Sequence, residues 1–330
     1  MILSPAILAL VGGAVIGAGL VGGAAAQGAV ILRGWDLQSG SERQLELERR
    51  TALVSTLVGH ALAFQLVSVF LFVFTADALA PQFTGAMCAA GSLKADPHGY
   101  PALLLMLGAA VAAGLWLIVD GADGRGHDYP LIRVKYVLLL LLAPLVLAAA
   151  AWEVAWFRGL HPEVITSCCG SLFSRAGRGV GADLAALPPR LAGTALFGTV
   201  GSAVVAALVF LKRGRGAVVL AALSAAALVA SLAGIVAFVS PYVYELPTHH
   251  CPFCLLQREY HFLGYPLYGS LLGGSVAGMG VGLLSLFRGA PSLAEALPAQ
   301  QRTLARVAAL LLGAFACLVA WAVWSSGLRT

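Results

Sequence analysis

Long runs of apolar residues alternate with short polar segments along the whole chain. A helix that crosses a bilayer needs about 20 predominantly apolar residues, and eight runs are close to or above that length. They occupy residues 5–32, 52–79, 101–119, 134–151, 192–211, 217–240, 262–287 and 304–326. The runs are continuous, whereas strands of a membrane barrel alternate apolar and polar positions over about ten residues. The pattern therefore predicts an all-α, polytopic integral membrane bundle of about eight transmembrane helices.

The first apolar run is expected to be an uncleaved span and not a signal peptide. No Lys or Arg precedes it, and it continues through Val30, Ile31 and Leu32, beyond the length of a typical signal-peptide core. No segment between the runs is long enough for a soluble domain. We therefore expect one transmembrane domain over residues 1–330.

The composition supports the same class and excludes others. Hydrophobic residues make up 60% of the chain and charged residues 11%, and the mean hydropathy is +0.90. Soluble domains contain about 25% charged residues, so a soluble enzyme or a disordered chain is excluded. The net charge of +5 is divided among short turns with no continuous basic patch. The expected partner is the lipid bilayer and not a nucleic acid.

The basic residues predict an orientation. With eight spans, residues 33–51, 120–133, 212–216 and 288–303 face the same side, and 13 of the 20 Lys and Arg residues belong to that side or to the adjoining helix ends. The positive-inside rule places this side in the cytoplasm. Both termini are then extracytoplasmic, and the protein is expected to be multi-pass in the inner (cytoplasmic) membrane.

The cytoplasmic side carries three polar features. Residues 41–50 read as a helical extension with an i,i+4 pair between Glu46 and Arg50. His60, the deepest ionisable residue, is expected to bond to a neighbouring helix or to have a function. A polar turn between the third and fourth spans is expected to be solvated. Its residues are Asp120, Asp123, Arg125, His127 and Asp128.

Glycine pairs four residues apart mark two spans for close packing. In lipid, small residues at this spacing allow helix backbones to approach each other. We expect these faces to be buried against helices of this chain, of a second copy in a homo-oligomer, or of other subunits of a membrane complex. The pairs are Gly13–Gly17, Gly19–Gly23, Gly269–Gly273 and Gly278–Gly282.

Five of the six cysteines are expected on the extracytoplasmic side. The predicted outer loops 80–100, 152–191 and 241–261 carry them, while Cys317 lies within the last span, where we expect a small buried residue. In bacteria this side is oxidising, so disulfides, thiol exchange and soft-metal binding are all permitted. The five loop cysteines are Cys88, Cys168, Cys169, Cys251 and Cys254.

The sharpest motif is Cys251-Pro252-Phe253-Cys254, followed by Arg258. Pro252 suits the first turn of a helix, so we expect both cysteines at the amino-terminal end of the span 262–287. There the helix dipole would stabilise a thiolate, and Arg258 would lie one turn after Cys254 on the same face. Leu255 follows the motif where a c-type haem site needs His, so such a site is excluded.

This segment resembles the DsbB family of quinone-linked disulfide-generating membrane proteins and, more distantly, the vitamin K epoxide reductase family. The resemblance implies that Cys254 lies next to a quinone, with Arg258 beside it, and that Cys251 exchanges with a second cysteine pair. In the family the motif follows the first helix, whereas here it follows the sixth span. The second pair must therefore come from upstream, from Cys88, Cys168 or Cys169. We also expect His261 near the quinone.

Three functions remain open at this level. The first is a membrane thiol–disulfide redox protein that exchanges electrons between an extracytoplasmic thiol protein and quinone. The second is binding or transfer of copper, mercury or another soft metal. Its candidate ligands are Cys168, Cys169, Cys251, Cys254, His249 and His250. The third is a structural or anchoring subunit of a larger membrane complex, with static disulfides between its outer loops.

Overall fold

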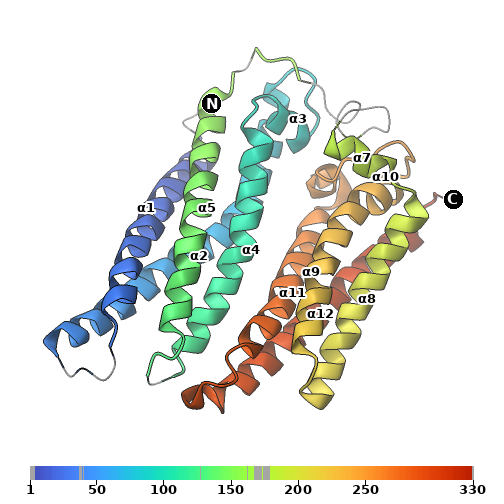
Figure 1. Ribbon diagram of the computed structural model, residues 1–330. Coiled ribbons are helices and arrows are strands. Elements are labelled where there is room, and N and C mark those ends of the chain that lie inside the picture. Colours follow the sequence, from blue (N-terminus) through green and yellow to red (C-terminus); the bar gives the residue numbers. More distant parts are fainter. Residues whose placement is uncertain are drawn as a thin grey trace. The chain divides into compact units, whose positions relative to one another are not determined.

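The computed structural model describes residues 4–36, 39, 41–126, 128–161, 163–166, 173 and 179–328 (Figure 1). These residues form helices joined by turns, and eight helices are long and apolar enough to cross a membrane. The predicted class, a polytopic helical membrane protein, is confirmed, and each predicted span coincides with one long helix. The long helices are α1 (Pro5–Gly34), α2 (Glu42–Leu79), α4 (Gly99–Asp123), α5 (Ile132–Gly159), α8 (Pro189–Arg213), α9 (Ala217–Gly234), α11 (Gly264–Ser285) and α12 (Ala296–Ser325).

Shorter helical segments extend or connect the long ones. The 3₁₀ turn η1 (Ala80–Gln82) continues α2, and the π-helix η2 (Ile235–Val239) with α10 (Ser240–Tyr244) continues α9. The remaining segments are α3 (Ala89–Lys94), α7 (Val180–Ala186) and the 3₁₀ turns η3 (Cys254–Leu256), η4 (Arg258–Tyr260) and η5 (Pro291–Leu293).

Helix ends follow local sequence signals. The side chain of Ser4 accepts a hydrogen bond from the amide of Ile7 and caps α1, with Pro5 in the first turn. The basic turn between α8 and α9 contains Gly214 and Gly216, both in the left-handed region with φ of 66° and 88°. Residues with a Cβ rarely adopt this conformation, so the glycines allow two long helices to be joined by so short a turn.

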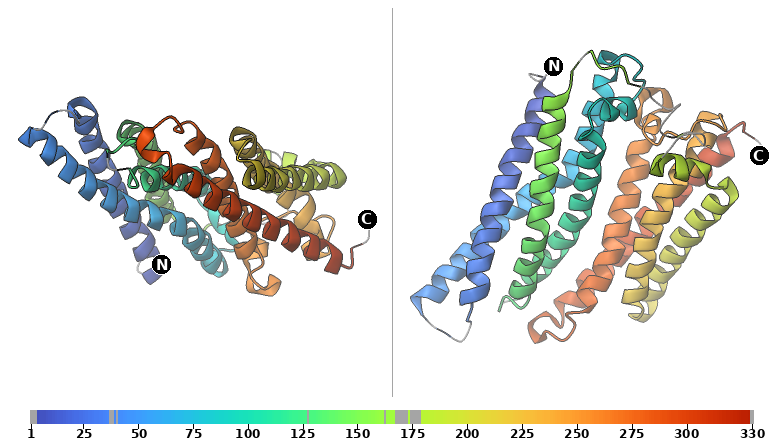
Figure 2. Two further views of the ribbon diagram at one scale, coloured as in Figure 1. Left: turned by 90° about the horizontal axis from the view of Figure 1, so that it is seen from below. Right: turned by 45° about the horizontal axis from the view of Figure 1, so that its top comes forward.

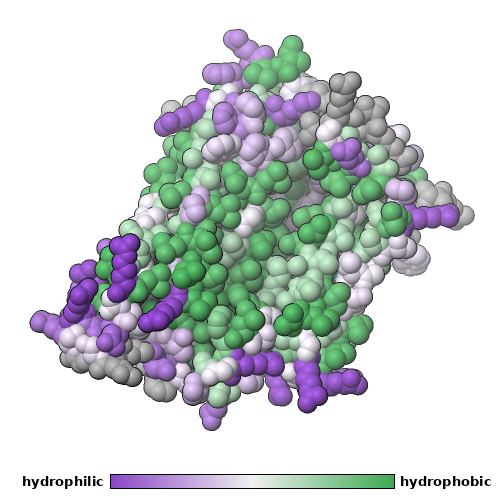
Figure 3. Space-filling view, in the orientation of Figure 1, coloured by the Kyte–Doolittle hydropathy of each residue, from purple (hydrophilic) through white to green (hydrophobic). Residues whose placement is uncertain are grey.

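The surface has the polarity that a bilayer requires. Figure 3 shows hydrophobic residues over the middle of the helices and hydrophilic residues gathered at helix ends. On α2, one exposed face carries Leu53, Leu57, Phe64 and Val67, whose spacing follows the helical repeat. This face suits contact with lipid. The predicted helical extension is confirmed, since α2 begins at Glu42, and Arg50 Nε donates to Glu46 Oε1 at 2.9 Å.

The chain divides into two compact units. Unit 1 contains residues 1–75, 96–160 and 287–298, and unit 2 contains residues 76–95, 161–286 and 299–330. Within unit 1, α5 packs against both α1 and α4 (Figures 1 and 2). Its core includes the fully buried Trp116 and Tyr136. In unit 2, α9 packs between α8 and α11, around a core that includes Phe210, Leu220 and Val281.

The glycine pairs of one span pack closely within this chain, and those of the other do so only in part. On α11, a Cβ at Gly278 or Gly282 would collide with Ser224 or Ala221 of α9, so these glycines permit the close approach. On α1, Gly13 contacts Phe64, but the described part of the chain places no atom within 4 Å of a Cβ at Gly19 or Gly23. Small residues permit close packing without requiring it.

The polar turn after α4 is not simply solvated, contrary to the prediction. Asp123 is 0% exposed, and its Oδ2 lies 2.7 Å from Nζ of Lys135, which is itself 3% exposed. Asp123 Oδ1 also accepts a hydrogen bond from the amide of Leu131 at 2.8 Å, while Asp120 lies 3.2 Å from Lys135 Nζ. A buried charge must be paired, and this helix junction supplies the pairing. His127 lies outside the described residues.

His60 bonds within its own helix, and Cys317 is not buried as expected. Nδ1 of His60 lies 2.7 Å from the carbonyl oxygen of Thr56, in its own helix and not in a neighbouring one. Cys317 is exposed on α12 and not buried. Since α12 is a candidate span, the Cys317 side chain is placed to contact lipid.

Candidate functional site

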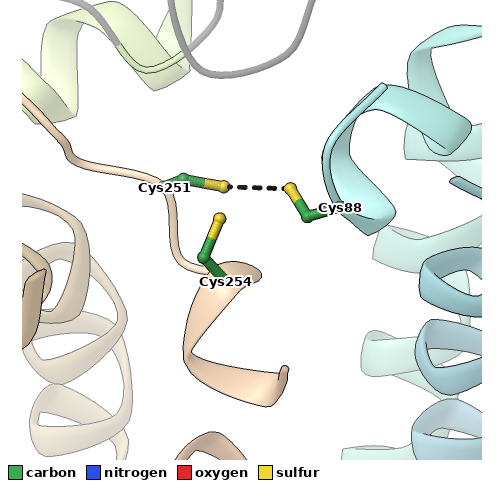
Figure 4. A group of neighbouring side chains, drawn as sticks. All are labelled: Cys88, Cys251 and Cys254. Atoms are coloured by element: carbon green, nitrogen blue, oxygen red, sulfur yellow. Dashed lines mark hydrogen bonds between the residues drawn. The ribbon is translucent and has the colours of Figure 1, made fainter. Parts of the chain in front are cut away.

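Three cysteine side chains from two distant parts of the chain meet in unit 2. The sulfur atoms of Cys88, Cys251 and Cys254 all lie within 4.8 Å of one another, and the three residues are buried. Cys88 Sγ and Cys251 Sγ are 3.6 Å apart. Figure 4 shows these two sulfurs facing each other, with the sulfur of Cys254 directed toward Cys251. We call this group the thiol cluster.

Cys88 reaches the thiol cluster from the segment that follows α2. It occupies the position immediately before α3, in extended conformation, and its carbonyl accepts the amide of Gly91 at 3.0 Å. Gly85, with φ of 86°, makes the preceding turn, and a Cβ there would collide with the carbonyl of Thr166. The fold therefore turns sharply after the second span and directs Cys88 inward.

The Cys-x-x-Cys segment forms a loop and a single 3₁₀ turn, contrary to the expected helix start. Cys254 begins η3, whereas the span helix α11 begins only at Gly264. Between them, Gln257 is extended, and both His261 and Phe262 have positive φ. The influence of a helix dipole is confined to the terminal turn, so α11 does not stabilise a thiolate at these cysteines in the predicted way.

The position of Arg258 also differs from the prediction. The extended backbone at Gln257 interrupts the helix between Cys254 and Arg258, so the two residues do not share a helical face. Arg258 is exposed, whereas Cys254 is 5% exposed. His261 is exposed as well and lies in the turn before α11.

Hydrogen bonds from tyrosines hold the loop at its backbone. Tyr244 OH donates to the carbonyl of Cys251 at 2.6 Å, and Ser240 Oγ donates to the same oxygen at 3.4 Å. Tyr268 OH donates to the carbonyl of Pro252 at 2.9 Å. The backbone of the motif is thus fixed from α10 on one side and from α11 on the other.

The two histidines before the motif are used in packing. His250 is buried, and its Nδ1 lies 3.1 Å from the carbonyl of Val236 in the π-helix η2. Because a carbonyl only accepts, this ring nitrogen is the donor. The ring of His249 packs edge-on against Tyr244 at 4.4 Å. Among the described residues, the group with metal-ligand spacing contains three cysteines and neither histidine.

A clasp of two polar side chains joins the Cys88 segment to the motif segment. Gln257 Nε2 donates to Asp77 Oδ1 at 3.0 Å and to the carbonyl of Met87 at 2.8 Å. Asp77 Oδ1 also accepts the amide of Ala89 at 3.0 Å. The residues on both sides of Cys88 are therefore tied to a residue three positions after Cys254. No local pattern in the sequence marks Gln257 for this role.

Cys168 and Cys169 lie outside the described residues. Described residues on both sides of them contact the elements of the thiol cluster. The amide of Thr166 donates to the carbonyl of Thr84 at 2.9 Å. The hydroxyl of Thr166 donates to the carbonyl of Gly91 at 3.0 Å. The ring centroid of Phe173 lies 6.2 Å from that of Phe253. Phe253 is one of the two residues between Cys251 and Cys254 in the sequence.

No protein-family model, curated protein or solved structure matches this chain. The interpretation of the thiol cluster therefore depends on its own geometry and chemistry.

Proposed function

We propose that this protein is a membrane thiol–disulfide oxidoreductase that passes electrons from an extracytoplasmic thiol protein to membrane quinone. The observation that carries the proposal is the 3.6 Å approach of Cys88 Sγ to Cys251 Sγ, in a cluster that also contains Cys254. A protein that moves a disulfide between partners needs a third thiol beside a cysteine pair. The thiol cluster provides that arrangement.

The exchange chemistry follows from the order of the sulfurs. A thiolate attacks one sulfur of a disulfide and displaces the other, so a disulfide between Cys251 and Cys254 can pass to Cys88 and Cys251. Cys251 is the shared partner in both. A disulfide requires a sulfur separation of about 2.05 Å, so closing either bond needs a rotation of side chains and not a new fold.

The electron balance involves two substrates. A dithiol of the extracytoplasmic protein becomes a disulfide as the disulfide of the cluster is reduced to two thiols. Quinone then accepts two electrons and two protons from those thiols, which restores the disulfide and yields quinol. The sequence predicts that Cys88, Cys168 or Cys169 passes electrons in, and the proximity of Cys88 to Cys251 supports this part for Cys88.

Burial favours redox chemistry of this kind. Thiols and disulfides are both neutral, so the states before and after each exchange place no charge in an apolar environment, and only the attacking and leaving thiolates are charged in passing. Cys88 and Cys251 are both 0% exposed, and isolated charges at such positions are costly. The groups that hold the loop backbone are neutral hydroxyls of Ser240, Tyr244 and Tyr268.

The decisive experiment counts free thiols in the purified full-length protein by alkylation and intact mass. After reduction and removal of the reductant, decylubiquinone should lower the number of alkylated cysteines by the two that form a disulfide. Cys251→Ser should abolish the change. Cys317→Ser, which removes an exposed cysteine of α12, is the matched control and should leave it intact. A thiol count that quinone never changes would refute the proposal.

A second candidate, soft-metal binding, is favoured by the mutual proximity of all three sulfurs. Three thiolates within 4.8 Å match the preference of Cu(I) and related soft ions for sulfur ligands. Elemental analysis of protein purified without chelators is the test. Near-stoichiometric metal that is lost in Cys251→Ser and retained in Cys317→Ser would support this function over the first.

A further inference from the structure

Unit 1 contains a recess between two of its helices. It has a volume of about 350 Å³, which falls in the range of small-ligand sites. Residues of α2 and α4 line it, with polar and apolar groups on its wall. The lining residues are Ser55, Thr56, Gly59, His60, Ala63, Leu117 and Asp120.

The wall of the recess carries an excess negative charge. Asp120 and Asp123 both face the single ammonium group of Lys135, at 3.2 Å and 2.7 Å. Asp123 is fully buried, and its two oxygens are occupied by Lys135 and by the amide of Leu131. Two carboxylates against one ammonium leave one negative charge. Asp120, 23% exposed, brings that charge to the recess.

The wall also offers a hydrogen-bond acceptor. His60 Nδ1 lies 2.7 Å from the carbonyl of Thr56 and must donate to it, so Nε2 of the neutral ring is an acceptor. A ligand that carries a positive charge and several N–H donors complements this wall. A primary ammonium group has three such donors.

The surroundings indicate where such an ammonium comes from. His60 lies on the exposed face of α2 that also carries Leu57 and Phe64, one turn before and after it. This face belongs to a candidate membrane span. The recess therefore opens toward lipid, with Ala63 and Leu117 on its wall. Asp120 lies three residues before the end of α4 at Asp123, and lipid headgroups are expected near the ends of membrane-spanning helices.

We infer that this recess binds the ammonium headgroup of an aminophospholipid. Asp120 supplies the charge, and His60 accepts a further N–H bond. The apolar wall lies beside the glycerol and the first part of the acyl chains. The site is separate from the thiol cluster and does not depend on its chemistry.

Native mass spectrometry of the full-length protein in detergent tests the inference. With an equimolar mixture of dioleoyl phosphatidylethanolamine and dioleoyl phosphatidylcholine, we expect the first lipid to be retained about tenfold more, because charge-assisted hydrogen bonds are strong and the quaternary headgroup has no N–H donor. Asp120→Asn should remove this preference. Glu295→Gln, which removes an exposed carboxylate elsewhere in unit 1, should retain it.

Two further arms keep the result decisive. Ala63→Phe fills the recess without altering the ion pairs, so it should lose the lipid even if Asp120→Asn folds poorly; circular dichroism and size exclusion report folding. Soluble phosphoethanolamine should fail to displace the lipid. Equal retention of the two lipids, an unchanged preference in Asp120→Asn or Ala63→Phe, or displacement by the soluble amine would each overturn the inference.

Discussion

Unit 1 contains a buried cluster of charged groups around Lys135 and Asp123, whereas the thiol cluster of unit 2 consists of neutral sulfur groups. Lys135 and Asp123 are 3% and 0% exposed and lie 2.7 Å apart. Cys88 and Cys251 are equally buried at 3.6 Å. A buried ion pair is held together because separating it would leave an uncompensated charge. Buried thiols have no such constraint, so they can exchange partners within a fixed fold.

This difference implies that substitutions in the two clusters will have different consequences. Removing a charge should destabilise unit 1 strongly. Removing a sulfur should change the stability of unit 2 little and abolish its chemistry.

Asp123→Asn should have the largest effect on stability. It leaves Lys135 facing only Asp120 at 3.2 Å, and breaking a buried ion pair costs about 3 to 5 kcal/mol. Denaturation in mixed micelles, followed by circular dichroism, measures the loss. The control is Glu46→Gln, which breaks the exposed Glu46–Arg50 pair and should cost about 1 kcal/mol or less. Similar losses in both variants would show that the buried pair has no special role.

Much of the fold is readable in the sequence because membrane solvation acts on each segment separately. An apolar run of sufficient length specifies a span without reference to its neighbours, and the run 5–32 became α1 (Pro5–Gly34) almost unchanged. Packing is different, because it is a property of helix pairs. Gly19 and Gly278 are each followed by a glycine four residues later, yet among the described residues Gly278 contacts a neighbouring helix and Gly19 does not.

The candidate site was readable only in part, for the same reason. The Cys-x-x-Cys spacing is local and was recognised. The approach of Cys88 to Cys251 joins residues 163 positions apart, and the clasp between Asp77 and Gln257 joins residues 180 apart. No periodicity records such pairings. Likewise, in the sequence Lys135 is only one of the basic residues that predict the membrane orientation. Its contact with Asp123 forms across the turn that joins α4 and α5.

Tyr244→Phe should have the next largest effect on stability. It removes the 2.6 Å hydrogen bond to the Cys251 carbonyl and leaves that oxygen only the 3.4 Å contact with Ser240. A buried acceptor that loses its partner costs about 1 to 3 kcal/mol. The same denaturation experiment measures it, with Tyr242→Phe as the control, since Tyr242 belongs to the same helix and its ring packs on Phe238. An unchanged midpoint in Tyr244→Phe would mean that the loop is fixed by other contacts.

Gln257→Leu should slow disulfide formation between Cys88 and Cys251 with a smaller effect on stability. The substitution keeps the size of the side chain but removes its hydrogen bonds to Asp77 and Met87. If these hydrogen bonds contribute about 1.4 kcal/mol to holding Cys88 near Cys251, and the whole loss raises the activation free energy, the rate falls about tenfold. Alkylation trapping during mild oxidation gives the rate.

The matched control for Gln257→Leu is Gln301→Leu. Gln301 belongs to unit 2 as well and is fully buried. Its side chain donates to the carbonyl of Val281 in α11. Gln301→Leu should lower the stability of unit 2 and leave the rate of disulfide formation between Cys88 and Cys251 unchanged. If both variants slow oxidation equally, the clasp does not position Cys88, and the rate reflects the general integrity of unit 2.

Cys251→Ala should have the smallest effect on stability and completes the contrast with Asp123→Asn. It removes one buried sulfur atom and no charge, so the free energy of unfolding should fall by about 1 kcal/mol, as for the loss of one buried methylene-sized group. The carbonyl that anchors the loop to Tyr244 belongs to the backbone and remains. Thiol counting should nevertheless show no quinone-dependent disulfide. A loss as large as that of Asp123→Asn would mean that Cys251 is primarily a structural residue, and the thiol cluster would then be a staple and not a redox centre.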